Sequence, residues 1–311
     1  MSRTLAFALG VALDAGLGDP PTRFHPVGLV GAAAHLLRTR APSDAQSRER
    51  YGLVVAAGLP LAGALLSYGL RRAVGRGEVG RALIDGLVLD ACSSLRTLSL
   101  RASEVEAALA AGDLPRARML CATHLVSRDT STLSASEVAG ATIESVAENL
   151  SDAVVAPWLA FAVGGAPAAA YRVANTMDAL WGYRTEQFHA LGHASARLDD
   201  VLNVLPARLT ALAIVLAAGV HTNGSAPSAR SALATWWADA RRTESPNAGH
   251  PMAAMAGAIE VVLAKRGAYT LGAAFRKPAA ADIGRAIRIS RRAALLIAVA
   301  VFGTVVVTGA R

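Results

Sequence analysis

Long apolar stretches alternate with arginine-rich polar stretches along this chain. Three stretches carry no charged residue and approach the length of about 20 residues that a helix needs to cross a bilayer core; they span residues 52–70, 153–171 and 293–310. A shorter run, 209–220, extends back through 201–206 around the charge of Arg208. The run 5–17 is apolar apart from Asp14, and we expect it to be retained because it lacks a small-residue cleavage site. The pattern predicts about four to five membrane helices.

The remaining pattern favours an all-α, polytopic integral membrane protein. Strand-like alternation is almost absent, and the polar residues 101–133 have a helical period that breaks at Gly112-Asp113. Residues 153–171 contain Pro157, Gly164-Gly165 and Pro167. A helix broken within the membrane is tolerated only where it is buried in protein or lines a cavity. We therefore expect one broken or re-entrant segment there, within a single membrane-embedded domain that comprises residues 1–311.

Composition and charge support a membrane protein and argue against a nucleic-acid partner. Charged residues make up only 17% of the chain, against about 25% in soluble domains. The net charge of +8 comes almost entirely from arginines that flank the apolar stretches, as cytoplasmic loops of membrane proteins do. Four arginines precede the last apolar stretch and only Arg311 follows it. We therefore expect the segment before this stretch to be cytoplasmic and the C-terminus to lie outside, with the protein as a multi-pass component of the cell membrane.

An acidic stripe marks the helix predicted over residues 134–152. Ser134 and Glu137 have the spacing of a capping box, which starts a helix. Glu144, Glu148 and Asp152 then recur every four residues and share one helix face. Like charges at this spacing repel each other, and a cation or a cationic substrate would relieve the repulsion. An ordinary solvated helix face is the alternative.

A second acidic group follows the broken segment. Asp178, Asp199 and Asp200 accompany nearby amides, a set that suits Mg²⁺ bound to phosphate oxygens. Interleaved guanidinium groups, which bind phosphate or carboxylate bidentately, come from Arg128, Arg184, Arg197 and Arg208. The same acids and arginines could instead simply pair with one another.

Other motifs do not support a function. Residues 75–80 match a dinucleotide-binding glycine pattern but follow an apolar helix instead of a strand. Neither lysine is followed by Ser or Thr, which excludes a P-loop. His189 and His193 lack a third metal ligand, and Cys92 and Cys121 are interpreted as two buried thiols.

Long motifs distributed over most of the chain resemble the CbiB/CobD family of membrane adenosylcobinamide-phosphate synthases. The resemblance begins with Gly18-Asp-Pro-Pro, His25-Pro-Val and Ser127-Arg-Asp-Thr-Ser131. It continues through residues 143–157, Asn175-Thr-Met-Asp178 and Gly182-Tyr-Arg184. It ends with residues 196–208 and Ser245-Pro-Asn-Ala-Gly249. His250 and Met252 depart from the residues expected at those positions.

The resemblance implies a role in cobalamin biosynthesis and an amide-forming ligase. Such enzymes join (R)-1-amino-2-propanol or its O-phosphate to a propionate carboxyl of adenosylcobyric acid, with ATP as activator. The cofactors implied are ATP and Mg²⁺, neither of them tightly bound. The partners implied are these substrates and membrane lipid; other enzymes of the corrinoid pathway and a second copy of the chain remain open.

The same motifs locate the expected site. Catalytic roles are expected for Glu144, Glu148 and Asp152, and Mg²⁺ binding for Asp178, Asp199 and Asp200. Substrate and phosphate binding are expected for Arg128, Asp129, Asn149, Asn175, Tyr183, Arg184, Arg197, Asn203, Arg208 and Asn247. Two alternatives stay open: a Mg²⁺-dependent membrane transferase of a phosphorylated or prenyl substrate, and a corrinoid-related transporter, for which related chain halves are not found.

Overall fold

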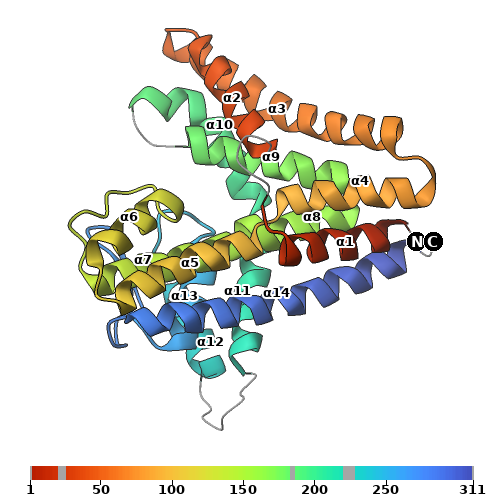
Figure 1. The fold of residues 1–311 in the computed structure, drawn as a ribbon. Coiled ribbons are helices and arrows are strands. Elements are labelled where there is room, and N and C mark those ends of the chain that lie inside the picture. Colours follow the sequence, from red (N-terminus) through yellow and green to blue (C-terminus); the bar gives the residue numbers. More distant parts are fainter. Residues whose placement is uncertain (1, 20–25, 183–185, 220–227, 310–311) are drawn as a thin grey trace. The chain divides into compact units, whose positions relative to one another are not determined.

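A computed structural model describes residues 2–19, 26–182, 186–219 and 228–309 (Figure 1). Within these ranges the chain is built from α-helices and one short β-hairpin, which confirms the all-α class. The chain forms two compact units. The first contains residues 1–94, 156–203 and 300–311, and the second contains residues 95–155 and 204–299.

The first unit consists of long helices and the end of the last helix. They are α1 (Ser2–Gly16), α2 (Pro26–Thr39), α3 (Ala45–Val74), α4 (Gly77–Cys92), α8 (Ala156–Val163), α9 (Gly165–Trp181), α10 (Glu186–Leu202) and the end of α14 (Ala280–Gly309). Helix α1 packs along α4, and α3 packs against α9 and α10. Phe7 of α1 contacts the rings of Trp158 and Phe161 at centroid distances of 5.9 and 6.0 Å. The Trp158 indole N–H also donates to the Ser93 hydroxyl at 3.0 Å, so this aromatic cluster buries no unpaired indole donor.

The second unit is organised around a buried helix. Its elements are α5 (Leu95–Ala110), α6 (Leu114–His124), α7 (Ala135–Leu150), a π-helix (Ser151–Val155), α11 (Val204–Gly219), α12 (Ser228–Asp239), α13 (Gly249–Ile259), β1 (Leu263–Lys265), β2 (Tyr269–Leu271) and the start of α14. Helix α7 packs against α5, α6, α13 and β1. Its residues 138–147 are all buried. This is possible because most of their side chains are small, which lets neighbouring backbones approach closely.

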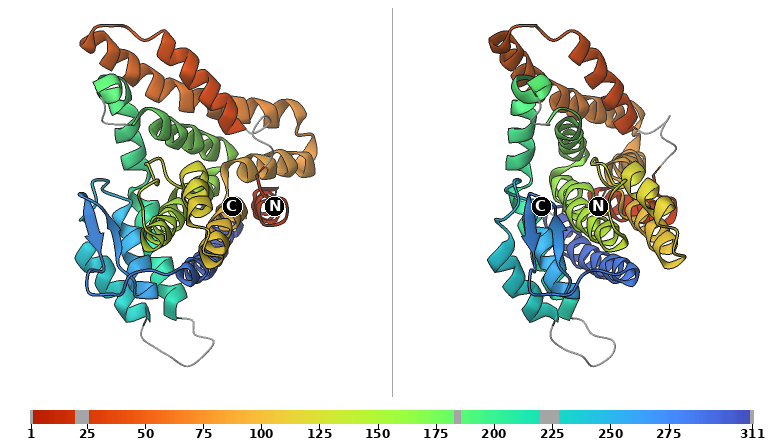
Figure 2. Two further views of the ribbon diagram at one scale, coloured as in Figure 1. Left: turned by 60° about the vertical axis from the view of Figure 1, so that its left-hand side comes forward. Right: turned by 90° about the vertical axis from the view of Figure 1, so that its left-hand side faces the viewer.

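The hairpin β1–β2 adds a polar edge to the second unit. The strands are antiparallel, with Leu263 opposite Leu271 and Lys265 opposite Tyr269, and they are drawn as blue arrows in Figure 2. Leu263 and Leu271 are fully buried. Successive side chains of a strand point to opposite faces, so the hairpin anchors itself through its leucines.

Three described helical spans are long and apolar enough to cross a membrane: Ala45–Val74, Ala135–Val163 and Ala280–Thr308. A fourth is formed if Phe188–Leu202 and Val204–Gly219, which are bent by 45° relative to each other, count as one broken span. These spans contain the predicted apolar stretch 52–70 and most of the stretches 209–220 and 293–310. The chain is therefore a polytopic integral membrane protein. The three described spans are fewer than the expected four to five, and the count reaches four if the broken pair is one span.

The predicted break in residues 153–171 is confirmed, but the stretch is not a span of its own. Helix α8 ends at Val163 and α9 begins at Gly165, with Gly164 at a φ of 157°, a conformation that L-residues rarely adopt. The preceding span begins at Ala135 and therefore includes the acidic helix. A π-helical turn lies just before Pro157, whose ring would clash with the preceding turn of a regular α-helix. The π-helical turn accommodates this ring. The re-entrant path of the segment stays a prediction.

Candidate functional site

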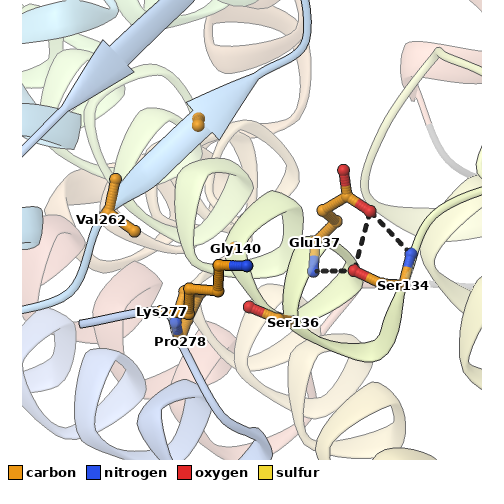
Figure 3. A pocket seen from close by; sticks show the side chains of 8 residues that line it. Ser134, Ser136, Glu137, Gly140, Val262, Lys277 and Pro278 are labelled. Carbon is orange, nitrogen blue, oxygen red and sulfur yellow. Dashed lines mark hydrogen bonds between the residues drawn. The ribbon is translucent and has the colours of Figure 1, made fainter. Parts of the chain in front are cut away.

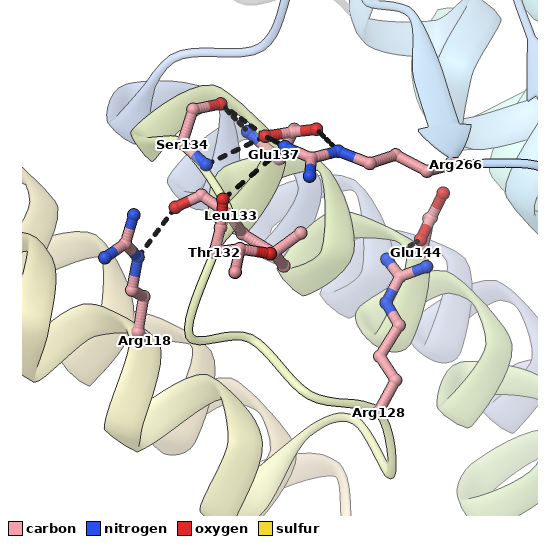
Figure 4. A network of polar contacts seen from close by, with 8 residues as sticks. All are labelled: Arg118, Arg128, Thr132, Leu133, Ser134, Glu137, Glu144 and Arg266. Atoms are coloured by element: carbon pink, nitrogen blue, oxygen red, sulfur yellow. Dashed lines mark hydrogen bonds and ion pairs between the residues drawn. The ribbon is translucent and has the colours of Figure 1, made fainter.

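Arg128 and Glu144 form an ion pair in the second unit (Figure 4). Arg128 lies in the loop between α6 and α7, and its Nη2 donates to Glu144 Oε2 at 3.0 Å. The Glu144 side chain is only 6% exposed, whereas that of Arg128 is 25% exposed. A buried carboxylate needs such a partner, because an unpaired charge in the interior is very costly. The alternative that acids and arginines pair with each other therefore holds for these two residues.

The pair leaves hydrogen-bonding capacity unused. Glu144 Oε1 and Arg128 Nε are both buried and have no hydrogen-bond partner. The phenol of Tyr269, on β2, interacts with the Glu144 carboxyl. Burial and the negative charges of Glu144 and Glu148 raise the pKa of Tyr269, which keeps its hydroxyl protonated. A free acceptor and a free donor lie in one buried pair, an arrangement that buried polar groups rarely show without a water or a ligand.

The acidic stripe is present, with one change in geometry. Glu144 and Glu148 lie on α7 and interact electrostatically, as their spacing predicts. Asp152 lies in the π-helix Ser151–Val155, where the α-helical period that placed it on the same face no longer applies. Asn149 donates to the Ser145 carbonyl at 2.9 Å and to the Ser145 hydroxyl at 3.2 Å, so it supports the helix that carries the glutamates.

Asp129 has a local structural contact. Its Oδ1 accepts from the Ser131 backbone N–H at 2.8 Å and its Oδ2 from the Ser131 hydroxyl at 2.9 Å. These hydrogen bonds, the backbone one first, lower the pKa of Asp129. The residue stabilises the loop that presents Arg128, while its expected contact with substrate stays a prediction.

In the first unit, the predicted Asn175, Asp199 and Asn203 lie in one hydrogen-bonded network. Asn175 donates to Asp199 Oδ1 at 3.1 Å, and Asn203 donates to Asp199 Oδ2 at 2.9 Å. The Tyr171 hydroxyl donates to Asn203 Oδ1 at 2.8 Å. Arg172 donates weakly to Asn175 at 3.4 Å and keeps a buried, unpartnered Nε. Two amides thus fix both oxygens of Asp199, and the network extends through Asn175 to Arg172, which the sequence did not single out.

The other predicted site residues of the first unit differ in how exposed they are. Asp178 and Asp200 are half-buried and Arg197 is exposed. Asp200 interacts electrostatically with Asp199. Tyr183 and Arg184 lie outside the described residues, so their expected roles stay predictions.

Arg208 and Asn247 are brought together in the second unit. Arg208 Nη1 donates to Asn247 Oδ1 at 2.7 Å and to the Val204 carbonyl at 2.9 Å. Asn247 is buried, in the loop before α13. Next to it, His250 accepts a hydrogen bond from the Trp236 indole at 2.9 Å.

No group of three or more His, Cys, Asp or Glu side chains that could hold a metal occurs among the described residues. Mg²⁺ is commonly bound by only one or two carboxylates together with water and substrate phosphate. The predicted Mg²⁺ role of Asp178, Asp199 and Asp200 therefore stays a prediction. His189 and His193 are both exposed.

A cavity of about 310 Å³ lies beside the start of α7 (Figure 3). Its lining consists of Ser134, Ser136, Glu137, Gly140, Val262, Ala264, Lys277 and Pro278. The predicted capping box is confirmed there, with Ser134 and Glu137 bonded reciprocally. Glu137 also pairs with Arg266 of the hairpin loop, and none of the predicted site residues lines this cavity.

The sequence did not single out Tyr269, Arg172 or His250 as site residues. No local sequence motif contains Tyr269 or Arg172, and only their contacts in the structure identify them as site residues. His250 stood out as a departure from the family's pattern, which was a usable signal.

Comparison with known proteins gives a consistent result. The family described as "CobD/Cbib protein" matches residues 7–297. A "Probable cobalamin biosynthesis protein CobD" of Methanothermobacter thermautotrophicus is 38% identical over 276 residues, covering 88% of each chain. A "Cobalamin biosynthesis protein CobD" of Chromobacterium violaceum is 37% identical over 321 aligned residues, covering 100% of this chain and 99% of its own. A third relative, from Stutzerimonas stutzeri, is 41% identical over 273 residues, with 86% and 84% covered. No solved structure matches.

Proposed function

Because this chain belongs to the CobD/CbiB protein family, we propose that it acts in cobalamin biosynthesis as an ATP-dependent acid–amine ligase of the cell membrane. It joins (R)-1-amino-2-propanol, or the O-phosphate of this amine, to a propionate carboxyl of adenosylcobyric acid. The product is adenosylcobinamide or its phosphate. The printed names of the relatives and the apolar helices support the pathway and the membrane location.

The observation that carries the ligase proposal is the buried Glu144 with one unpartnered carboxylate oxygen. The amine substrate is an ammonium ion at neutral pH and must lose a proton before it can attack. An ammonium group donates hydrogen bonds to a carboxylate, and a carboxylate in a poorly solvated site is suited to accept its proton. Glu144 Oε1 is the acceptor for that ammonium, and Glu148 adds a second negative charge next to it.

Arg128 and Tyr269 position Glu144. Arg128 occupies the other oxygen, Oε2, and so leaves Oε1 for substrate. Its unpartnered Nε–H can donate to the hydroxyl or phosphate oxygen two atoms away from the amine carbon. The free acceptor and the free donor of this pair therefore match the ammonium and the oxygen of an amino alcohol.

The carboxyl group of the corrinoid needs activation, because a carboxylate is a poor acylating agent. Transfer of the ATP γ-phosphoryl group to this carboxylate gives an acyl phosphate, and amine attack then releases phosphate. Bound Mg²⁺ would neutralise charge on the transferring phosphoryl group. Asp199 fits such an ion, because its oxygens each accept one amide N–H and retain further lone pairs. Asp178 and Asp200 are the other proposed ligands, and Arg184 and Arg197 the proposed phosphate contacts.

The test is a product assay with purified protein in lipid nanodiscs. Adenosylcobyric acid, ATP and Mg²⁺ are incubated with each amine in turn, and mass spectrometry detects the amide. We expect a product with the mass of the corrinoid plus the amine minus water, formed only with ATP. Absence of an amide with both amines, from protein that binds adenosylcobyric acid, would refute the ligase proposal.

Two variants test the assigned roles in this assay. Glu144→Gln should lower kcat by about 10²–10⁴-fold, the range of a lost general base. Asp199→Asn should abolish product formation, because a neutral amide does not supply the negative charge that a carboxylate provides for Mg²⁺. Glu104→Gln is the control, since Glu104 pairs with Arg101 on the half-exposed surface of α5. Full turnover by Asp199→Asn would exclude the Mg²⁺ role.

A further inference from the structure

Arg172 is a half-buried cation on α9 of the first unit. Its Nη1 donates weakly to Asn175 Oδ1 at 3.4 Å, and its Nε is buried without a hydrogen-bond partner. In the part of the chain that the structure describes, no carboxylate forms an ion pair with Arg172. Buried polar atoms without a partner are uncommon in proteins, so this guanidinium is a candidate to donate to a ligand.

A single amide connects Arg172 to Asp199. The Oδ1 of Asn175 accepts from Arg172, and its Nδ2 donates to Asp199 Oδ1 at 3.1 Å. The cation and the carboxylate therefore lie at opposite ends of one amide and do not pair directly. Arg71 and Asp85 of the same unit do pair directly, at 2.7 Å. The amide thus keeps the charges of Arg172 and Asp199 close together but available to other groups.

The network is supported from inside the protein and accessible from outside. Asn203 and Tyr171 are buried; Asn203 donates to Asp199 Oδ2 at 2.9 Å, and the Tyr171 hydroxyl donates to Asn203 at 2.8 Å. Arg172, Asn175 and Asp199 are only half-buried. Helices α9 and α10, which carry these residues, pack against each other. A ligand can therefore contact Arg172 and Asp199 while the buried support stays in place.

We propose that Arg172 binds a phosphate group beside Asp199. Mg²⁺ on a carboxylate is commonly coordinated by phosphate oxygens as well, and guanidinium N–H groups bind the other oxygens of a phosphate with good geometry. A carboxylate and an unpaired guanidinium joined by one amide suit these two tasks. The inference rests on the proposed function, because the phosphate would be that of ATP or of the aminopropanol phosphate.

The first test measures binding of adenylyl imidodiphosphate, a non-hydrolysable ATP analogue, with Mg²⁺ to the full-length protein in nanodiscs. Arg172→Gln should raise the dissociation constant about tenfold, because a charge-assisted hydrogen bond is lost. Arg40→Gln is the matched control, since it removes the same charge from the exposed turn after α2. It should change the constant by less than about twofold, because salt screens an exposed charge. Equal effects of both variants would overturn the proposal.

A second variant, Arg172→Lys, covers the case in which Arg172→Gln does not fold. It keeps the positive charge but lacks the Nε–H and the planar group that reaches two oxygens, so it should bind the analogue about threefold more weakly than the wild type. Thermal unfolding without nucleotide should match the wild type. Wild-type affinity in folded Arg172→Lys would overturn the proposal.

Two ligands identify the source of the phosphate. If it is ATP, Arg172→Gln weakens binding of the ATP analogue and leaves binding of the aminopropanol phosphate unchanged. If it is the aminopropanol phosphate, the variant has the opposite selectivity. A wild-type protein that binds neither compound in the presence of Mg²⁺ would overturn the phosphate site.

The product assay separates this inference from the ligase proposal. If the amide forms and Arg172→Gln changes neither kcat nor the KM for ATP or for the aminopropanol phosphate, the phosphate contact is refuted and the ligase proposal stands. If no amide forms but Arg172→Gln still weakens binding of one of the two compounds, the ligase proposal fails and the phosphate site stands.

Discussion

At the scale of single residues, two of the buried polar atoms without a hydrogen-bond partner belong to Arg128 and Glu144, which the sequence motifs had marked. Glu144 and Arg128 each keep one buried atom without a partner, and Arg172 keeps another in the first unit. Most buried polar groups in proteins are hydrogen-bonded. These exceptions are therefore better explained by a ligand or an ordered water than by fold stability.

The Arg128–Glu144 pair makes a testable contribution to stability. Arg128→Met leaves the Glu144 carboxylate buried without its partner, a change that costs roughly 3–5 kcal/mol for a fully buried pair. The cost should be smaller here because the Arg128 side chain is 25% exposed. The double variant Arg128→Met/Glu144→Gln should recover part of this loss. Denaturant unfolding in mild detergent measures both, and a double variant less stable than Arg128→Met alone would contradict the argument.

The sequence predicted that Glu144 and Glu148 share one face of α7, but not the complete environment of Glu144. Helical spacing alone predicts that Glu144 and Glu148 share a face, whereas Tyr269 lies on a hairpin far away in the sequence. Its contact depends on how the hairpin, through β1, packs against α7. No local pattern encodes such a contact, because hydrophobic periodicity reports on one element at a time.

At the scale of helices and strands, close packing through small residues explains how polar side chains reach the interior. Residues 138–147 of α7 are buried on every side, and Gly52 of α3 lies directly against the Leu191 backbone of α10. The break between α8 and α9 was predictable from Gly164-Gly165. The π-helix before it was not predicted, because it depends on how the helix adapts to Pro157.

Two glycines of α3 provide a matched test of helix packing. A Cβ at Gly52 would lie 2.2 Å from the Leu191 carbonyl, whereas one at Gly58 meets nothing within 4 Å. Gly52→Ala should destabilise the protein by about 1–3 kcal/mol through overpacking. Gly58→Ala should be neutral or stabilise it by up to about 1 kcal/mol, because Ala favours helix. Thermal unfolding in one detergent compares them, and equal shifts would refute the close α3–α10 contact.

At the scale of the whole molecule, the chain is a polytopic membrane protein of the CobD/CbiB family, and each of its two compact units holds some of the predicted site residues. The second unit contains the Arg128–Glu144 pair and the Arg208–Asn247 contact. The first contains the Asn175–Asp199–Asn203 network.

Arginine asymmetry predicts the orientation of the last helix. Arg285, Arg288, Arg291 and Arg292 lie in the first half of α14, and only Arg311 follows it. Cytoplasmic flanks are enriched in such charges. In a variant with Cys92 and Cys121 replaced by serine, a membrane-impermeant maleimide should label Arg311→Cys on intact cells and leave Ala279→Cys unlabelled until the cells are opened. The reverse result would invert the orientation.

The sequence by itself determined that this is a membrane protein, that it is helical, and to which family it belongs. The length of an apolar stretch decides whether it can cross a bilayer, and long motifs identify relatives. Both signals are local, because each lies in a run of consecutive residues. Only the tertiary structure decided which polar atoms are satisfied: Arg128 binds one oxygen of Glu144 and leaves the other without a partner, and Arg208 donates to the side chain of Asn247. Such outcomes depend on which distant elements pack together, and packing energy is shared among residues that no local pattern connects.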